Sequence, residues 1–290
     1  MKLSCIAQRE AKLLPILRQE LAMSSTLVKR LKYSHAFLVN GEAVRTNFPV
    51  KAGDLVEVIL DEATPEYPAQ EGELSILYED DFLIAIDKPP GMLMHPSPAR
   101  NEGTLANYLL SYYNRTGQPC AVHPVSRLDR DTFGVVLLAK NAHAHAKMHK
   151  QLLEGGLIKK YHAVVVGCPG EKEGIIDAPI ARQGPESLLR CIREDGKPAR
   201  SRYRLLEQGE GCSILELEPL TGRTHQLRVH CAYMGFPIAG DPQYGADEYG
   251  LAYQQLCAVS LGFVHPIRGN FIEILSKQKV SLDFLGLHGV

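Results

Sequence analysis

The chain has 290 residues, of which 45% are hydrophobic and 22% charged, and its formal net charge at pH 7 is -1. Such a chain can bury a substantial core, as one large domain or two smaller ones. The sequence contains no run of about 18 apolar residues, so it predicts no membrane span. Charged residues interrupt the N-terminal segment early, so it predicts no export signal. The seven cysteines are scattered without a CxxC pair, which argues against a disulfide framework or a zinc site and favours free thiols in the cytoplasm.

Positive charge gathers near the N-terminus. Residues 1–60 contain nine Lys or Arg and five Asp or Glu, whereas the remainder of the chain has an excess of five negative charges. This asymmetry predicts that the N-terminal part contacts a polyanion and that the larger part carries the chemistry. A basic surface that only keeps a small domain soluble is the alternative interpretation.

The first 60 residues predict two helices followed by a small sheet. Ser24 or Ser25 is a suitable N-cap for the second helix, and Asn40-Gly41 is typical of a hairpin turn. The predicted helices cover 13–21 and 26–33, and the predicted strands form a hairpin at 37–44 and an alternating strand at 50–60.

The segment DEATPEYPAQEGE at 61–73 contains five acidic residues and two prolines without apolar periodicity. This composition predicts an extended connector between separate cores. We therefore expect an N-terminal domain at 1–62, a linker at 63–74 and a catalytic domain at 75–290.

Short strands predominate after the connector, and two helices stand between them. The first helix follows Asn141 as its N-cap and ends at Gly155-Gly156, and the second covers 224–235. Hairpin turns at 208–211 and 265–270 favour a mixed, largely antiparallel sheet over alternating βαβ units, so the predicted fold class is α+β. The predicted strands cover 74–80, 82–89, 133–140, 160–167, 201–208, 212–220, 257–264 and 270–275.

The segment SRLDRDTFG at 126–134 places two arginines and two aspartates in a tight turn before an apolar strand. Turns at strand ends often carry functional sites. Arg127 and Arg130 would favour the anionic form of Asp129, which could then act as a nucleophile or a base. In an isolated Arg-Leu-Asp tripeptide, however, the aspartate more often caps its own turn and forms surface ion pairs.

A second dense segment is PLTGRTHQLRVHCAYMGFPIAGDPQYG, in which several glycines surround a helix with basic side chains. Arg223, His225, Arg228 and His230 lie in this segment. Basic groups next to flexible glycines suit the close approach of a phosphate or a buried ion pair. Ordinary turn chemistry and a solvated helix face are the competing interpretations.

Four ordered segments together resemble the RluA-type pseudouridine synthases over about 75–280 of the chain. A set of motifs in the order of the family is far more specific than any one motif. The N-terminal part is similar to the S-four-like RNA-binding domain that precedes the catalytic domain in many of these enzymes. The four segments are DKPPGMLMHPS at 87–97, SRLDRDTFG at 126–134, KKYHAVVVG at 159–167 and TGRTHQLRVHCAYMGFPIAGDPQYG at 221–245.

The resemblance implies a role for particular residues. Asp129 matches the aspartate that these synthases require, Tyr161 the tyrosine that packs on the target base, and Arg228 the arginine paired with the aspartate. Arg127 matches an arginine that helps to occupy the space of the flipped nucleotide, and Leu227 an aliphatic residue of the base pocket. We also expect Arg223 and His225 to contact the RNA substrate.

The implied reaction cleaves the bond between uracil and the sugar, turns the base and rejoins it through a ring carbon. It consumes no redox power, and the resemblance implies neither a metal nor a cofactor. Asp129 could attack the sugar, add to the ring or take a proton from the sugar. The stacking of a flipped base on Tyr161 is worth about 1–3 kcal/mol, which is comparable to the cost of extruding a poorly paired base.

Two residues depart from the family pattern, because Ser126 stands where His is usual and Phe133 where Ser is usual. They put RNA contact and turn packing in doubt rather than the reaction. Ribosomal RNA is favoured over transfer RNA as the substrate, and a catalytically idle RNA-binding adaptor is the alternative from another class. No obligate protein partner is indicated.

Three other patterns carry less weight. His145 and His149 have the i, i+4 spacing of metal ligands, but no neighbouring acid completes a site, so a solvated helix face is favoured. Asp129 and Asp131 are too close in one turn to straddle a glycosidic bond as a carboxylate pair. Cys231 has no activating base in sequence and is expected in the helix core.

Overall fold

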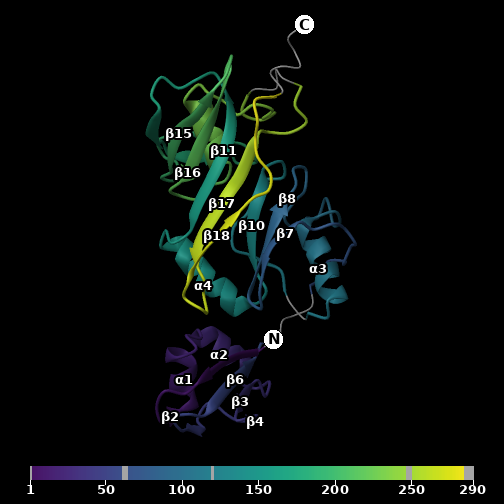
Figure 1. Ribbon diagram of the computed structural model, residues 1–290, viewed down its shortest axis with the longest axis vertical. Helices are drawn as coiled ribbons and strands as arrows, with labels where there is room; N and C mark the ends of the chain where they lie inside the picture. The colour runs from purple at the N-terminus through teal and green to yellow at the C-terminus, as the bar shows by residue number, and fades with distance from the viewer. Residues whose placement is uncertain (1, 61–64, 119–120, 246–249, 284–290) are drawn as a thin grey trace.

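The computed structural model describes residues 2–60, 65–118, 121–245 and 250–283. Two sheets of unequal size lie in separate parts of the molecule (Figure 1). The smaller sheet belongs to the first 60 residues, and the larger one is built from the rest of the chain. Within the described ranges, no helix is long and apolar enough to cross a membrane.

The N-terminal unit, residues 2–60, has the two predicted helices and the predicted hairpin. Ser24 caps the second helix, because its Oγ accepts a hydrogen bond of 3.2 Å from the N–H of Leu27. The first strand at Lys2–Ile6 was not predicted, and it pairs antiparallel with the strand at Leu55–Ile59. The elements of this unit are β1 Lys2–Ile6, β2 Ala11–Lys12, α1 Leu13–Gln19, α2 Ser25–Leu31, β3 Phe37–Val39, β4 Glu42–Ala43, β5 Pro49–Val50 and β6 Leu55–Ile59.

The larger sheet extends in the order β12-β15-β16-β11-β17-β10-β8-β7, with β18 paired to β17 and β9 to β10. All of its pairs are antiparallel except β10 with β17, which is parallel. A short hairpin of β13 and β14 lies outside it. The strands are β7 Ile76–Glu79, β8 Leu83–Lys88, β9 His123–Pro124, β10 Phe133–Ala139, β11 Ile158–Val166, β12 Glu173–Asp177, β13 Ile180–Arg182, β14 Arg190–Ile192, β15 Arg200–Gln208, β16 Cys212–Pro219, β17 Leu256–Val264 and β18 Phe271–Leu275.

The predicted fold class, α+β with a mixed and largely antiparallel sheet, is confirmed. The parallel contact needs a glycine at its centre. Gly134 has a φ of +102°, and a Cβ there would lie 2.3 Å from the carbonyl oxygen of Ala258 on β17. This glycine lets β10, which follows the Asp129 turn, approach β17 closely.

In the described residues after position 65, three helices accompany the larger sheet, one more than the sequence predicted: α3 Leu105–Arg115, α4 Ala142–Leu153 and α5 Gln226–Tyr233. Two were predicted, and Asn141 caps α4 through a hydrogen bond of 2.8 Å from the N–H of Ala144. The missed helix α3 begins with a capping box of Thr104 and Asn107. Its interior contains Tyr, Asn and Ser, which are weak helix formers, and this hid the helical pattern.

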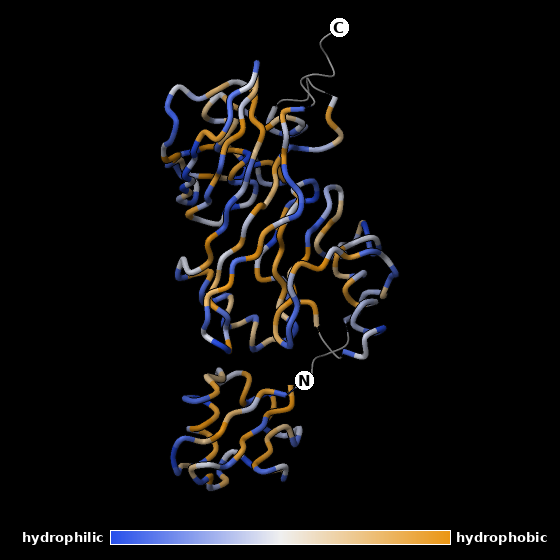
Figure 2. Tube along the Cα trace, in the orientation of Figure 1, coloured by the Kyte–Doolittle hydropathy of each residue, from blue (hydrophilic) through white to orange (hydrophobic). Residues whose placement is uncertain are grey.

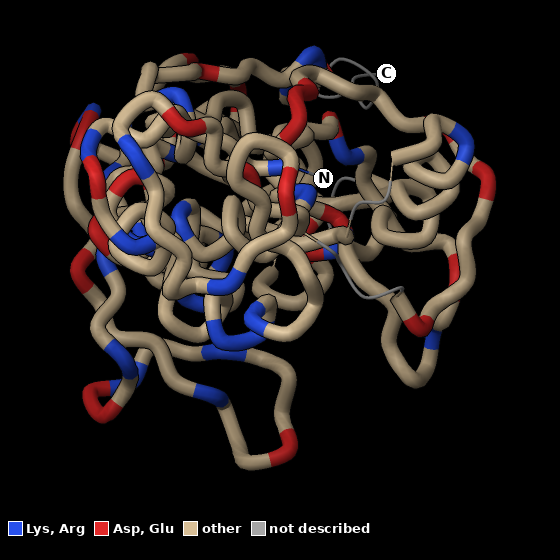
Figure 3. The backbone as a smooth tube through the Cα atoms, turned by 90° about the horizontal axis from the view of Figure 1, so that it is seen from below, with Lys and Arg blue, Asp and Glu red and all other residues tan. Residues whose placement is uncertain are grey.

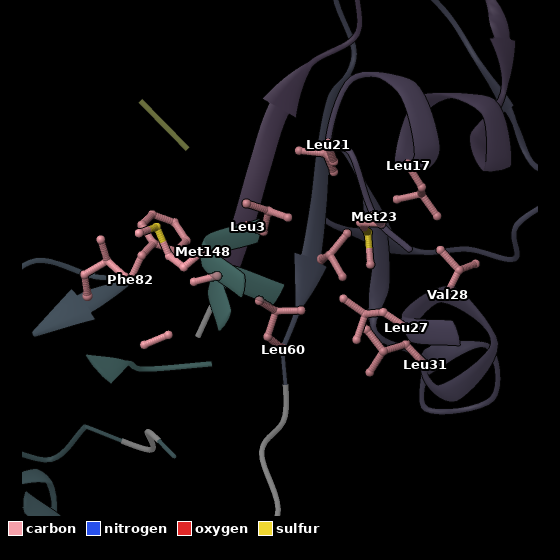
Figure 4. Packing of buried hydrophobic residues seen from close by; sticks show 14 of the residues in the cluster. Leu3, Leu17, Leu21, Met23, Leu27, Val28, Leu31, Leu60, Phe82 and Met148 are labelled. Carbon is pink, nitrogen blue, oxygen red and sulfur yellow. The ribbon is translucent and has the colours of Figure 1, made fainter. Parts of the chain in front are cut away.

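The apolar core follows the central strands. β8 and β10 are buried along their whole length, and the central strands are largely orange in Figure 2. One hydrophobic cluster contains Leu3 and Leu60 of the N-terminal unit together with Phe82 and Met148 (Figure 4). Met148 lies on α4, so this helix joins the core of the larger sheet to that of the N-terminal unit.

Candidate active site

Asp129 lies in the segment between β9 and β10, and its side chain is 31% exposed. Its Oδ2 accepts a hydrogen bond of 3.1 Å from Nη1 of Arg228 on α5. The two residues are 99 positions apart in sequence, and the sheet brings them together. The carboxylate thus remains reachable while one of its oxygens is paired with a positive charge.

Arg228 is buried and is held on its other side by Asp241, which is fully buried. Its Nε and Nη2 donate to the two oxygens of Asp241 at 2.7 and 2.8 Å, and Nη2 also donates to Oε1 of Gln243 at 2.8 Å. Burial opposes the charge of Arg228, but the hydrogen bonds and charges of Asp241 and Asp129 outweigh it and raise the pKa of Arg228. The bidentate pair fixes the direction in which Nη1 meets Asp129.

Asp241 is itself fixed by the backbone around it. Its Oδ1 accepts hydrogen bonds from the N–H groups of Gln243 and Tyr244 at 3.0 and 3.3 Å. The preceding Gly240 has a φ of +71°, and a Cβ there would lie 2.5 Å from the carbonyl oxygen of Tyr253. Only glycine fits this close approach, which sets the position of Asp241 behind Arg228.

Tyr161 on β11 is half-buried and touches the apolar clusters on both sides of it. One of these clusters contains Leu227, which is 6% exposed and precedes Arg228 on α5. Burial, reinforced by the negative charge of Asp129, raises the pKa of the Tyr161 hydroxyl. The ring and Leu227 therefore form an apolar wall that lies within electrostatic reach of Asp129.

His225 lies directly before α5 in the left-handed backbone region, with a φ of +57°. Its Nδ1 is 2.7 Å from the hydroxyl of Tyr244, whose oxygen accepts a hydrogen bond from the N–H of Arg190 at 2.9 Å. The hydroxyl proton is then free to bind Nδ1, which leaves the ring proton on Nε2, 4.0 Å from Oδ2 of Asp129. Burial lowers the pKa of His225, although the charge of Asp129 opposes this shift.

The other arginines that the sequence analysis singled out have no described hydrogen bond or ion pair with the Asp129 carboxylate. Arg127 is exposed, and Arg130 forms an ion pair with its neighbour Asp131 at 2.8 Å. The exposed Arg223 donates from Nε to the carbonyl of Pro198 at 2.9 Å. The guanidinium of Arg130 thus binds the adjacent Asp131 in the same turn, and the hydrogen bond that Asp129 receives comes from Arg228.

Lys88, at the end of β8, was not singled out by sequence reasoning. Its fully buried Nζ donates to the carbonyls of Pro89, Met92 and Arg130 at 2.9, 2.9 and 2.8 Å. Burial lowers the pKa of Lys88 to about 8, against the attraction of Asp131 and Asp129. The ammonium group thus ties the loop after β8 to the carbonyl of Arg130, the residue that follows Asp129.

The two departures from the family pattern lie on either side of Asp129. Phe133 is 4% exposed and packs edge to face against Tyr253, with ring centroids 5.8 Å apart. It therefore fills a core position, whereas Ser126 is half-buried at the start of the turn. Cys231 is fully buried, as expected, and burial raises its pKa to about 12.

Sequence reasoning also missed Asp241, Gln243 and Tyr244 as parts of this site. A signal for them was present, because an aspartate stands between Gly240 and a proline in AGDPQYG. Such a setting favours a fixed turn in which the carboxylate points inward. For Lys88 the signal was a lysine shortly after the apolar run FLIAI, where an ammonium group needs buried acceptors.

Comparison with known proteins places this site in a family. A family model described as RNA pseudouridylate synthase matches residues 82–233, which span β8 to α5 and include Asp129, Tyr161 and Arg228. The chain is 38% identical over 258 residues to the uncharacterized RNA pseudouridine synthase YlyB of Bacillus subtilis, covering 86% of this chain and 84% of that protein.

A second relative is ribosomal large subunit pseudouridine synthase D of Xanthomonas campestris pv. campestris, which is 37% identical over 81% of this chain and 76% of its own length. Among solved structures, human RNA pseudouridylate synthase domain containing 1 is similar, with a TM-score of 0.59 and 26% identity over 76% of this chain and 96% of that one. The fold and these matches define an RNA-modifying isomerase. The chain belongs to the RNA pseudouridylate synthase family, and its resemblance to the RluA-type enzymes is confirmed.

Proposed function

We propose that this pseudouridine synthase isomerises a uridine of large-subunit ribosomal RNA in the cytoplasm, with Asp129 as its catalytic residue. The observation that carries the catalytic assignment is the pairing of a partly exposed Asp129 with Arg228, which is itself locked by the buried Asp241. The RNA target rests on relatives whose names specify the large ribosomal subunit. Transfer RNA is the second candidate.

The pairing of Asp129 with Arg228 suits a carboxylate that must stay ionised in order to react. Arg228 neutralises part of the negative charge of Asp129 from one side, and the exposed part of the carboxylate faces the incoming nucleotide. The anion can attack the sugar, add to the uracil ring or accept a proton from the sugar. Each of these steps requires the unprotonated carboxylate, which the guanidinium favours.

The detached uracil needs a closed surface while it turns. Tyr161 and Leu227 supply an aromatic and an aliphatic wall beside Asp129. Stacking on such a ring contributes about 1–3 kcal/mol, enough to offset much of the cost of flipping a base. The exposed Arg127 then takes the place that the flipped nucleotide vacates, and His225 with Arg223 contacts the RNA near the site.

The N-terminal unit at 1–62 is proposed as a separate S-four-like RNA-binding domain, joined by a linker at 63–74 to a catalytic domain at 75–290. Residues 63–64 of that linker lie outside the described residues. Lys29, Arg30 and Lys32 are exposed on and after α2, and Lys32 places its Nζ 5.6 Å above the ring of the exposed Tyr33. This surface offers both phosphate binding and base stacking.

The catalytic proposal is tested by mapping pseudouridine in ribosomal and transfer RNA from cells that lack the gene, after incubation with purified protein. The wild-type enzyme is expected to modify large-subunit ribosomal RNA. Asp129→Asn should abolish the product while RNA binding persists, because only the anion is lost. Asp131→Asn is the matched control in the same turn and should retain most of the activity, since the hydrogen bonds described for Asp131 go to the exposed Arg130 and its charge adds only an attraction to Lys88.

Full activity of Asp129→Asn would overturn the catalytic role. Product in transfer RNA alone would replace the proposed substrate. An enzyme preparation that binds RNA but forms no pseudouridine in either RNA would favour the alternative of an idle adaptor.

The role of the N-terminal unit is tested with Lys29→Ser combined with Lys32→Ser. Each lost phosphate contact should lower the slope of log affinity against log salt by about 0.7–0.9. Binding to the ribosomal RNA transcript should weaken at low salt, with unchanged pseudouridine formation at saturating RNA. Unchanged binding would refute this surface as an RNA contact.

A further inference from the structure

A row of histidines lies beside the candidate active site and takes no part in it. The rings of His123 on β9 and His145 on α4 are stacked, with centroids 5.4 Å apart. His149, one turn further along α4, lies 6.0 Å from His145. His145 and His123 are half-buried and His149 is exposed, so the row is open to solvent.

The row continues toward the active site through His95, which lies in the loop after β8. His95 is half-buried and meets the ring of Tyr67 edge to face at 6.1 Å. The charges of His123 and Arg127 both repel its protonated form. His123, Arg127 and Asp129 follow one another in a single segment, so the backbone of His123 lies at most about 20 Å from that of Asp129.

Positive groups outnumber negative ones around the row. Arg127 faces His95, and α4 adds Lys147, which donates to the carbonyl of Pro266 at 3.1 Å. Lys150 on the same helix lies 3.8 Å from Glu154, and both of these side chains are largely exposed. Glu66 is an exposed acid next to Tyr67.

Burial and neighbouring positive charge both disfavour the protonated forms of His95 and His145. Burial lowers the pKa of His145, and repulsion from His123 and His149 lowers it further, against a hydrogen bond to the carbonyl of Pro124 at 3.2 Å. Burial, followed by repulsion from His123 and Arg127, likewise lowers the pKa of His95. An anion placed along the row would remove this repulsion, and the rings would then take up protons.

A metal ion does not fit this row. In the part of the chain that the structure describes, no group of three or more His, Cys, Asp or Glu has an arrangement that could hold a metal. The ring of His145 also uses its Nε2 for the Pro124 carbonyl, so that its neutral form carries the proton there. Its Nδ1 remains available, and protonation at Nδ1 creates a donor suited to a phosphate oxygen.

We propose that His95, His123, His145 and His149 form a proton-linked binding site for the phosphates of the RNA chain next to the target uridine. The proposal rests on RNA being the substrate and goes beyond it by assigning a path between Arg127 and α4. Met148 on α4 belongs to the same hydrophobic cluster as Leu3 and Leu60 of the N-terminal unit, so the path ends on the helix that shares a core with that unit (Figure 4). RNA binding along it is coupled to proton uptake.

The test measures the dissociation constant of an unmodified large-subunit ribosomal RNA transcript at pH 6 and pH 8, at fixed ionic strength. Asp129→Asn protein is used throughout, so that the RNA is bound but not converted. We expect several-fold tighter binding at pH 6, because each histidine whose pKa rises by about one unit on binding can contribute at most about tenfold. The salt dependence should also be steeper at pH 6.

The combined variant His145→Gln and His149→Gln should lose this gain at pH 6 while its affinity at pH 8 stays within about twofold of the parent. Glutamine retains a donor for the Pro124 carbonyl but does not titrate. The matched control is His162→Gln on β11, a half-buried histidine 4.0 Å from Glu216 and away from the row. It should keep the full pH dependence, and circular dichroism at both pH values verifies that each variant is folded.

A pH dependence that is the same in the double variant and in its parent overturns the proposal. So does an equal loss of affinity at both pH values, because it would mean that the rings bind without protonation. The identity of the substrate is judged separately, by whether the wild-type enzyme forms pseudouridine in the transcript. If only a transfer RNA transcript is converted, ribosomal RNA is refuted as the substrate. The same comparison of binding at the two pH values is then made with the transfer RNA.

Discussion

Two groups of arginine–carboxylate pairs, one on the larger sheet and one beside it, have similar chemistry and different surroundings. Arg202 and Arg204 on β15 pair with Glu218 and Glu216 on the neighbouring strand β16, and more than half of each arginine side chain is exposed. Basic and acidic residues alternate in this way around much of the molecule (Figure 3). Arg228 instead is 6% exposed and is shared between Asp241 and Asp129.

The degree of burial determines whether an arginine–carboxylate pair fixes the geometry of its side chains. The exposed pairs are screened by water and add little to stability. The buried guanidinium has lost its hydration and depends on its partners, so its direction is fixed by Asp241. The active-site pair therefore gains a defined geometry, which the surface pairs do not need.

The largest effect should follow removal of the fixed partner. Asp241→Ala leaves Arg228 buried without its bidentate acceptor, and breaking such a pair costs about 3–5 kcal/mol. Urea denaturation should show this loss of unfolding free energy, and pseudouridine formation should fall sharply because Nη1 is no longer aimed at Asp129. A loss below 1 kcal/mol, about that of an exposed pair, would contradict the distinction.

Lys88 tests a buried charge whose partners are neutral carbonyls. Lys88→Met keeps the length of the side chain but leaves three carbonyls without their donor, at a cost of about 2–3 kcal/mol. The catalytic rate should fall more than RNA affinity, because the turn that holds Asp129 loosens. If the rate is unchanged, the lysine does not position that turn.

His143 on α4 is also buried, but unlike Lys88 it has a ring nitrogen without a hydrogen-bond partner among the described residues. Among the described residues, its Nε2 has no hydrogen-bond partner, and burial, with repulsion from Lys147, lowers its pKa to about 4. Between pH 6.5 and 4 the unfolded chain binds this proton more readily, so stability falls as the pH falls. From pH 7 to pH 5 the loss due to this group is about 2 kcal/mol.

His143→Leu should remove that part of the acid sensitivity. The check is the unfolding free energy of the variant and of the wild type, measured with urea at pH 7 and pH 5. Equal losses in the two proteins on acidification would show that His143 does not titrate in this window.

The smallest effect is expected at the exposed pairs. Glu218→Gln removes the partner of Arg202 and should change the unfolding free energy by less than about 1 kcal/mol, with pseudouridine formation intact. Raising the salt concentration should shrink even this difference. A loss as large as that of Asp241→Ala would mean that exposure does not separate the two groups.

Local patterns were enough for much of the fold. Apolar periodicity and cap residues located α1, α2 and α4, and Asn40-Gly41 marked the first hairpin correctly. Elements without such signals were missed, namely β1, β2, β9, the short strands from β12 to β14, and α3. Short exposed strands have little apolar alternation, and the tyrosines of α3 resemble strand residues.

The sequence by itself determined the family and indicated the residues that we propose for the chemistry. Ordered motifs indicated Asp129, Tyr161 and Arg228, and the family match agrees with the reaction that they implied. It could not determine which charges meet, because local spacing put Arg127 and Arg130 beside Asp129. The tertiary structure decided this: Arg130 binds Asp131, and Asp129 receives Arg228 from a helix 99 residues away, fixed by Asp241 and with Lys88 beneath the turn. The pairing of charges depends on their distance and burial after the sheet has assembled, and the residue spacing within a single turn predicts neither.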